Sequence, residues 1–318
     1  MEDRNRNDQN TDDKNMDGKK KALILGGSGA LSGALAELAK KEYEVWAVTR
    51  GNRPLPKGIH GMKADRDDED LQQIIQAHIS QVDVVFDCIC MNAEHANRDW
   101  EIFSQMTNRL VVVSTDSVYD PRYKRTPQGE EGVFLDISDE SVRDYATEKR
   151  RMEVAFERKI KEEPKGLAVT IFRPGHLYGK GLLLGCYPEE SRKTDLAERM
   201  KAGEILRLVA GGIYLIHPVY VRDLAKTMLS CVDNERTYRR IFCIGGPEAF
   251  ENRHYYQVLA DLLGVELKIE EVALEGYVEA HPEFAGHLNH RIYDLSALRE
   301  TGVWMPNTSL EEGLKEVL

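Results

Sequence analysis

The sequence predicts an α/β protein whose core is a doubly wound parallel sheet. Short, continuously apolar runs alternate along the chain with amphipathic helical segments, and the first of these runs ends in a glycine-rich turn. Strands that are apolar on both faces are typical of parallel sheets covered by helices on both sides. The chain has 318 residues, 42% of them hydrophobic and 31% charged. That is enough for one large α/β domain or two ordinary domains.

The expected elements follow one another in regular order. Residues 22–25 form the first strand, and 30–40 the first helix, because Leu31, Leu35 and Leu38 recur at spacings of four and three. A strand over 43–48 and a helix over 71–78 come next. Further strands are expected over 82–87, 110–113 and 166–172, and a helix opens at residue 144. The last expected helices cover 219–232, 252–263 and 310–318.

Composition excludes several classes of protein. Residues 1–20 are rich in Asn, Asp, Arg and Lys, and we expect them to form a disordered tail rather than a secretory signal. A net charge of -11 argues against a nucleic-acid partner, and the apolar runs fall short of the roughly 20 residues that a membrane span needs. Five scattered cysteines predict reduced thiols and a cytoplasmic location. Neither Cys88-Ile-Cys90 nor His287-x-x-His290 forms a recognisable metal motif, so we expect no metal.

A phosphate-binding loop is predicted between the first strand and the first helix, in the segment Gly26-Gly-Ser-Gly29-Ala-Leu-Ser32-Gly33. Glycines let the backbone approach a pyrophosphate, and the helix N-terminus supplies oriented N–H donors. Ser32 stands where a third glycine often occurs, and it is small enough for close packing. A simple tight turn is the alternative. We expect cofactor contacts from Gly26, Ser28, Gly29, Ala30 and Leu31.

This loop leads to a prediction of domain organisation. A Rossmann-like dinucleotide-binding domain is expected over 21–180 with parts of 215–248. A smaller C-terminal α/β substrate-binding domain is expected over 181–214 and 249–318. The second strand ends in Thr49-Arg50-Gly51-Asn52-Arg53, which has two guanidiniums and no carboxylate. Because arginine grips phosphate through paired hydrogen bonds, Arg50 and Arg53 predict that NADP is preferred over NAD. The alternative is a solvated basic loop.

Two segments carry the predicted chemistry. Ser114-Thr115-Asp116-Ser117-Val118-Tyr119 follows a strand, and Tyr145 and Lys149 lie four residues apart on one helical face. A free phenol has a pKa near 10 and is a poor base at neutral pH. A nearby ammonium favours the phenolate, so Lys149 brings Tyr145 toward a useful pKa. We predict Thr115, Tyr145 and Lys149 as catalytic residues, with Thr115 holding the substrate oxygen.

With these motifs the chain resembles the extended short-chain dehydrogenase/reductase family, the NAD-dependent epimerase/dehydratase group, as a somewhat atypical member. The resemblance covers about 21–318 and includes Ala64-Asp65-Arg66, Phe172-Arg-Pro-Gly-His-Leu-Tyr-Gly179, Val221-Arg-Asp-Leu-Ala225 and Ile244-Gly-Gly246. It implies further cofactor contacts from Asp65, Arg66, Cys88, Lys149 and Pro174. It also implies substrate contacts from Asp116 and His176.

Departures from the family pattern bear on the substrate. Ser117 replaces the glutamate that acts as base in family dehydratases. Nucleotide-sugar epimerases of the family have an arginine shortly before the segment that resembles 219–223, and the stretch 214–218 has none. His217 or Lys180 are the alternatives for holding a diphosphate. The expected function is an NAD(P)-dependent oxidoreductase or epimerase acting on a hydroxyl or ketone of a polar, nucleotide-sugar-like substrate. A simple ketone or aldehyde reductase of a secondary pathway and a non-catalytic dinucleotide sensor or scaffold are the alternatives. A homodimer is a candidate assembly.

Overall fold

The computed structural model describes residues 18–186 and 188–318. The predicted tail over 1–20 therefore lies mostly outside the described residues. Its last residue is not part of a tail, because Lys20 already belongs to the first strand and pairs with Tyr43 of the second.

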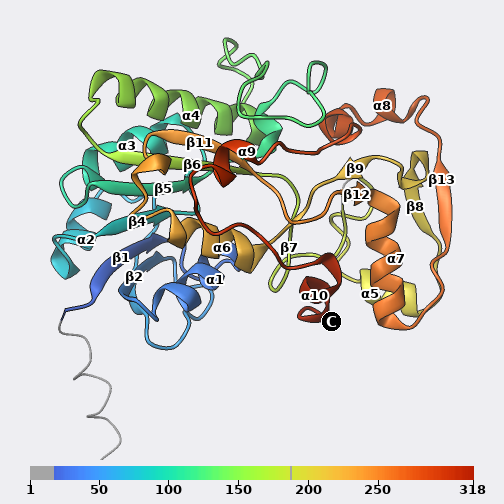
Figure 1. The fold of residues 1–318 in the computed structure, drawn as a ribbon, viewed down its shortest axis with the longest axis horizontal. Helices are drawn as coiled ribbons and strands as arrows, with labels where there is room; N and C mark the ends of the chain where they lie inside the picture. The colour runs from blue at the N-terminus through green and yellow to red at the C-terminus, as the bar shows by residue number, and fades with distance from the viewer. Residues whose placement is uncertain (1–17, 187) are drawn as a thin grey trace, which may run out of the picture.

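A seven-stranded sheet forms the centre of the larger lobe (Figure 1), and each of its pairings is parallel. This confirms the doubly wound parallel sheet. In spatial order its strands are β11 (Arg240–Ile244), β6 (Ala168–Pro174), β5 (Arg109–Val113), β4 (Val84–Asp87), β1 (Lys20–Leu25), β2 (Tyr43–Thr49) and β3 (His60–Lys63). The two edge strands, β11 and β3, were not predicted. Strand β3 has the sequence His-Gly-Met-Lys, which lacks a continuous apolar run, whereas β11 ends in the mostly buried apolar run 241–244 and could have been predicted from it.

Helices cover both faces of this sheet (Figure 1). On one face α2 (Leu71–His78), α3 (Ala93–Phe103) and α4 (Tyr145–Glu162) bury Ile75, Trp100 and Phe156 against the strands. On the other face α1 (Ala30–Ala39), α6 (Val221–Ser230) and the short α9 (Ser296–Arg299) bury Leu35, Met228 and Leu298. Both faces of the sheet are thus shielded from solvent by helices, as its apolar strands require.

The smaller lobe is built from segments that follow residue 180 (Figure 1). Its core gathers side chains of α5 (Leu196–Lys201), α7 (Asn252–Leu263), α10 (Leu310–Lys315) and β8 (Leu206–Val209), the last of which pairs with β13 (Ile269–Val272). Two further pairs of short strands are β7 (Leu177–Tyr178) with β10 (Val219–Tyr220) and β9 (Leu215–Ile216) with β12 (Phe250–Glu251). The remaining short helices are α8 (Tyr277–Ala280), η2 (Asp116–Val118), η3 (Ala210–Gly212), η4 (Glu235–Thr237) and η5 (Pro282–His287).

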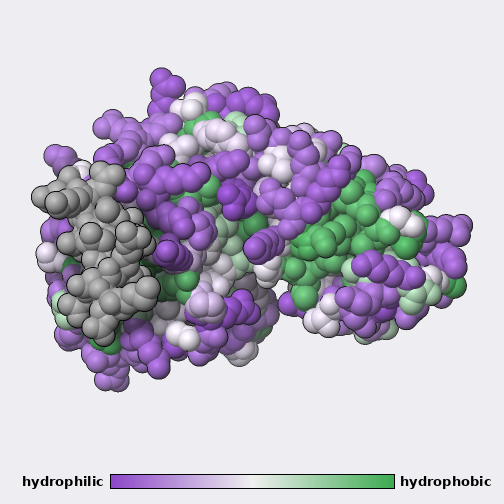
Figure 2. All heavy atoms as spheres, turned by 90° about the horizontal axis from the view of Figure 1, so that it is seen from below, coloured by the Kyte–Doolittle hydropathy of each residue, from purple (hydrophilic) through white to green (hydrophobic). Residues whose placement is uncertain are grey.

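Two predicted helices have different bounds in the structure. The segment 219–232 begins as strand β10 and becomes helical only at Val221, because Val219 and Tyr220 pair with Leu177 and Tyr178. The last helix ends at Lys315 instead of residue 318. Seen from below, an indentation separates the two lobes, and apolar residues gather on the smaller one (Figure 2). Within the described ranges, the structure contains no helix with the length and apolarity to cross a membrane.

Candidate active site

The glycine-rich loop lies at the carboxyl edge of the sheet, between β1 and α1. Strand order reverses between β1 and β4, and ligands of open α/β sheets bind at such a point. Gly26 and Gly27 have φ values of 107° and 30°, which favour glycine. A Cβ on Gly27 would lie 2.6 Å from the Cβ of Ala47 and 2.8 Å from Leu55. The backbone can therefore follow this path only if residues 26 and 27 have no side chains.

Helix α1 begins directly after this loop, at Ala30. Ser32 accepts a hydrogen bond of 3.0 Å from the N–H of Gly29, so the serine that replaces a third glycine closes the first turn. The first turn of α1 contains no acidic residue, and Ser28 lies 3.2 Å from the hydroxyl of Thr49 at the end of β2. An uncharged helix N-terminus beside a side-chain-free turn fits the pyrophosphate of a dinucleotide.

Polar side chains at the ends of β2 and β3 border the same edge. Arg50 and Arg53 are exposed, and the guanidinium of Arg50 lies 3.8 Å from the carboxylate of Asp65. Asp65 is itself 40% exposed. These three side chains are therefore free to meet a ligand from solvent.

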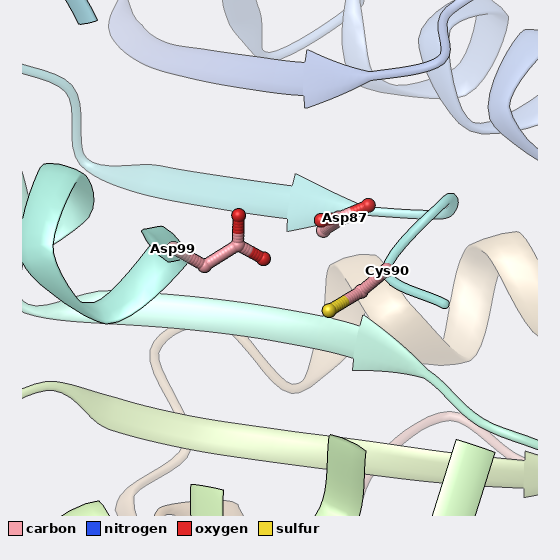
Figure 3. A group of neighbouring side chains, drawn as sticks. All are labelled: Asp87, Cys90 and Asp99. Atoms are coloured by element: carbon pink, nitrogen blue, oxygen red, sulfur yellow. The ribbon is translucent and has the colours of Figure 1, made fainter. Parts of the chain in front are cut away.

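Arg66, the expected neighbour of Asp65 in adenine contact, lies inside the protein instead. Its guanidinium donates to Asp87 at 2.5 Å and to Asp99 at 2.7 Å, and its side chain is 5% exposed. Asp87 ends β4, Cys90 lies in the following loop and Asp99 comes from α3 (Figure 3). Arg66 holds the pKa of Asp87 below its usual range, whereas burial raises that of Asp99. The guanidinium thus ties β3, β4 and α3 together, and the sequence contains no motif for this cluster.

The predicted catalytic residues surround the ends of β4 and β5. Lys149 is 3% exposed, and its Nζ donates hydrogen bonds of 2.7 Å to the carbonyls of Cys90 and Val113. The Nζ also lies 5.9 Å from the ring centre of Tyr145, the first residue of α4. Tyr145 is 52% exposed, and Thr115 lies two residues after the end of β5. Burial lowers the pKa of Lys149. A buried ammonium therefore lies beneath an exposed phenol at the carboxyl edge.

Two further residues expected to contact the cofactor lie on neighbouring strand ends. Cys88 follows β4 and is half-buried, and Pro174 is the buried last residue of β6. Burial raises the pKa of the Cys88 thiol, which therefore stays protonated. Both positions border the same edge as the glycine loop.

Asp116 is the centre of a buried ion cluster. Its carboxylate accepts hydrogen bonds from Arg291 at 2.7 and 2.8 Å, from Lys124 at 2.9 Å, and from the hydroxyl of Tyr293. Arg291 and Lys124 hold the pKa of Asp116 well below its usual range despite burial. Asp116 is consequently a charged acceptor rather than a proton donor. Lys124, Arg291 and Tyr293 belong to no motif in the sequence.

His176 lines a cavity that continues from this cluster. The cavity is small, with a volume of about 20 Å³, and His287 and Arg291 also line it. The Nε2 of His176 lies 3.3 Å from the thiol of Cys186. Burial lowers the pKa of His176 to about 4 and that of His287 to about 3. Both imidazoles are therefore neutral at pH 7.

His217 is occupied inside the protein. Its Nε2 lies 2.8 Å from the carbonyl of Gly246, and its Nδ1 accepts a hydrogen bond of 3.3 Å from the backbone of Tyr293. It is therefore unavailable to replace the arginine missing before 219–223. Lys180, the other alternative, is exposed.

Comparisons with known proteins give a family and several relatives. A model of the NAD dependent epimerase/dehydratase family matches residues 22–245. The chain is 27% identical over 248 residues to the chloroplast stem-loop binding protein of 41 kDa b from Arabidopsis thaliana. This match covers 72% of this chain and 59% of that relative's length. It is 25% identical to the UDP-N-acetyl-alpha-D-glucosaminuronate decarboxylase of Bacillus cytotoxicus, over 94% of this chain and 97% of that enzyme.

Solved structures share the fold. The UDP-glucuronic acid 4-epimerase from Bacillus cereus, solved in complex with UDP-glucuronic acid and NAD, superposes with a TM-score of 0.71 at 17% identity. The match covers 93% of this chain and 97% of that one.

Proposed function

Because this chain belongs to the NAD dependent epimerase/dehydratase family, we propose that it is a nicotinamide-dependent oxidoreductase or epimerase. Its proposed substrate is a polar, nucleotide-sugar-like molecule that reacts at a hydroxyl or ketone. One observation carries this proposal: Thr115, Tyr145 and Lys149 gather at the carboxyl edge of the sheet, beside a glycine loop shaped for a pyrophosphate. A 25% identical decarboxylase of a UDP-linked uronic acid supports the substrate class.

Each of these residues has a proposed role. When bound, the nicotinamide supplies the hydride acceptor or donor. The hydroxyl of Thr115 orients the substrate oxygen, and the phenol of Tyr145 takes or returns the proton of that oxygen. Lys149, whose Nζ lies 5.9 Å from the tyrosine ring, favours the phenolate and donates to the nicotinamide ribose. The two carbonyls that accept from Lys149, one in the loop after β4 and one at the end of β5, fix the position of its Nζ.

The proposed cofactor is NADP in preference to NAD. Arg50 and Arg53 are exposed at the end of β2, where an adenosine 2′-phosphate would lie. Asp65 already lies 3.8 Å from Arg50, so the guanidinium has a carboxylate neighbour when no phosphate is bound. Cofactor contacts from the glycine loop, Cys88 and Pro174 belong to the same proposal.

Partners and location are proposed on general grounds. The Arabidopsis relative is named a stem-loop binding protein, but the net charge of -11 argues against a nucleic-acid partner for this chain. All five cysteines are free thiols, which suits a reducing cytoplasm. We also propose a homodimer, which sedimentation at several protein concentrations would test.

Turnover with a panel of nucleotide sugars tests the enzyme proposal. Nicotinamide absorbance detects net redox, and chromatography of the products detects redox-neutral epimerisation. The matched variant is Tyr145→Phe, which removes one oxygen from an exposed side chain and keeps the ring. We expect its cofactor affinity to stay and its turnover to fall about 10²- to 10⁴-fold. Full activity of Tyr145→Phe would refute the mechanism and favour a dinucleotide sensor.

A further inference from the structure

A buried arginine on β6 connects the two segments that carry the proposed catalytic residues. Arg173 is the second-last residue of β6 and is 1% exposed. Its Nε and Nη2 each donate a hydrogen bond of 2.8 Å to the carboxylate of Glu153, a fully buried residue of α4. Its Nη1 donates at 2.8 Å to the hydroxyl of Tyr119 and at 2.9 Å to the carbonyl of Glu130. One planar guanidinium therefore binds a helix on one side and the segment after β5 on the other.

The helical side of this contact leads to Tyr145. Tyr145, Lys149 and Glu153 are spaced four residues apart, so they lie along one face of α4. Two backbone carbonyls hold the Nζ of Lys149 independently of Arg173. The ion pair of Glu153 therefore fixes the helix against β6 one turn beyond Lys149.

The other side of the contact leads to Thr115. Thr115 and Tyr119 are the residues that flank the single-turn helix η2. The hydroxyl of Thr115 accepts a hydrogen bond of 3.2 Å from the N–H of Ser117, and the N–H of Tyr119 donates back into the same turn. The guanidinium carbon of Arg173 lies 5.0 Å from the centre of the Tyr119 ring, which adds a cation–π contact. A displacement of Tyr119 would therefore move Thr115 as well.

We propose that Arg173 is a positioning residue that sets the separation between Thr115 and Tyr145. The inference rests on the proposed function, because these two side chains are the proposed anchor and the proposed acid–base for one substrate oxygen. Both must reach that oxygen, yet they belong to different elements. A guanidinium bound to both elements fixes their separation, whereas a contact to one element leaves it free. A misplacement of about 1 Å by a change away from the chemistry can cost on the order of 10²-fold in rate.

Steady-state kinetics of folded variants tests this inference, with the nucleotide sugar that the wild type turns over fastest as substrate. Arg173→Met removes the contacts on both sides, and its kcat per folded molecule should fall about 10- to 100-fold. Arg173→Lys can pair with Glu153, but a single ammonium lacks the fork that binds both sides, so its kcat should fall less. The Kd of the nicotinamide cofactor should stay within about threefold in both variants, because Lys149 keeps its two carbonyl partners.

A double-mutant cycle separates positioning from stability. Tyr119→Phe removes the hydroxyl on one side of Arg173, and Glu153→Gln removes the charge on the other. If the guanidinium couples the two sides, the double variant should lose less kcat than the product of the two single losses, since either change already frees one segment. Multiplicative losses would overturn the inference. Tyr119→Phe and Arg173→Lys change few atoms, so they carry the test if Arg173→Met does not fold.

The matched control is Arg109→Met. Arg109 is also a buried arginine, 3% exposed, but it lies at the opposite end of β5 from Thr115 and donates to the carbonyls of Val232 and Ala168. Its loss should lower stability and leave kcat per folded molecule unchanged. A wild-type kcat in folded Arg173→Met, or an equal fall in Arg109→Met, would overturn the inference alone. A wild type that turns over no nucleotide sugar would instead refute the proposed function.

Discussion

Replacing Asp116 by Asn is the perturbation whose effect the structure defines best. The substitution keeps the shape of the side chain and removes its charge. In the wild type this carboxylate accepts hydrogen bonds from Arg291, Lys124 and Tyr293. The amide would leave both cations buried without an ionic partner.

The expected loss of stability follows from this geometry. Breaking a buried ion pair by removing one partner costs about 3–5 kcal/mol. For a protein of this size, that corresponds to a fall in Tm on the order of 10 °C. The double variant Asp116→Asn/Arg291→Met carries the same one-charge excess as the wild type, so it should recover part of the loss.

Urea unfolding followed by circular dichroism measures these free energies, and kinetics on the folded fraction separates stability from catalysis. Because the pKa of Asp116 is held well below its usual range, it donates no proton. The turnover of folded Asp116→Asn should therefore fall much less than that of Tyr145→Phe. A stability loss under about 1 kcal/mol, or a double variant no more stable than the single one, would refute the charge argument.

Three further predictions concern the cofactor site and pH. Lys149→Met should lower turnover at least as much as Tyr145→Phe and should also weaken cofactor binding. The limb of the pH profile that Tyr145 sets should shift toward the pKa of a free phenol, and an unchanged profile would contradict the role of Lys149. Arg50→Ala should reduce the ratio of NADP to NAD affinity, measured by fluorescence titration, and an unchanged ratio would exclude the 2′-phosphate contact. In the unfolded state His176 and His287 bind protons as pH falls below 6.5, whereas burial holds their pKa at about 4 and about 3 in the folded state. The unfolded state therefore binds more protons, and the free energy of unfolding should fall as pH drops from 6.5 to about 4. His176→Gln should flatten this dependence by as much as about 3 kcal/mol, and an identical pH dependence in the variant would refute it.

Much of the nucleotide-binding half was predictable from local sequence. Apolar runs that end in glycine, and leucines at helical spacing, reflect constraints between residues close in the chain. Strands β1, β2, β4, β5 and β6, the helix at 252–263 and the helical face shared by Tyr145 and Lys149 were predicted for this reason. Elements with weak local signals were missed, among them β3, which has the sequence His-Gly-Met-Lys.

The tertiary structure decided which side chains are available for chemistry. Arg66 follows Asp65 in the chain, yet it turns inward because Asp87 and Asp99 approach it from β4 and α3. Arg291 reaches Asp116 across 175 residues of sequence. Pairings of this kind satisfy buried charges between distant elements, and no local spacing encodes them. The sequence alone therefore determined the sheet, the glycine loop and the order of the motifs, whereas the charge of the cavity depends on contacts that only folding creates.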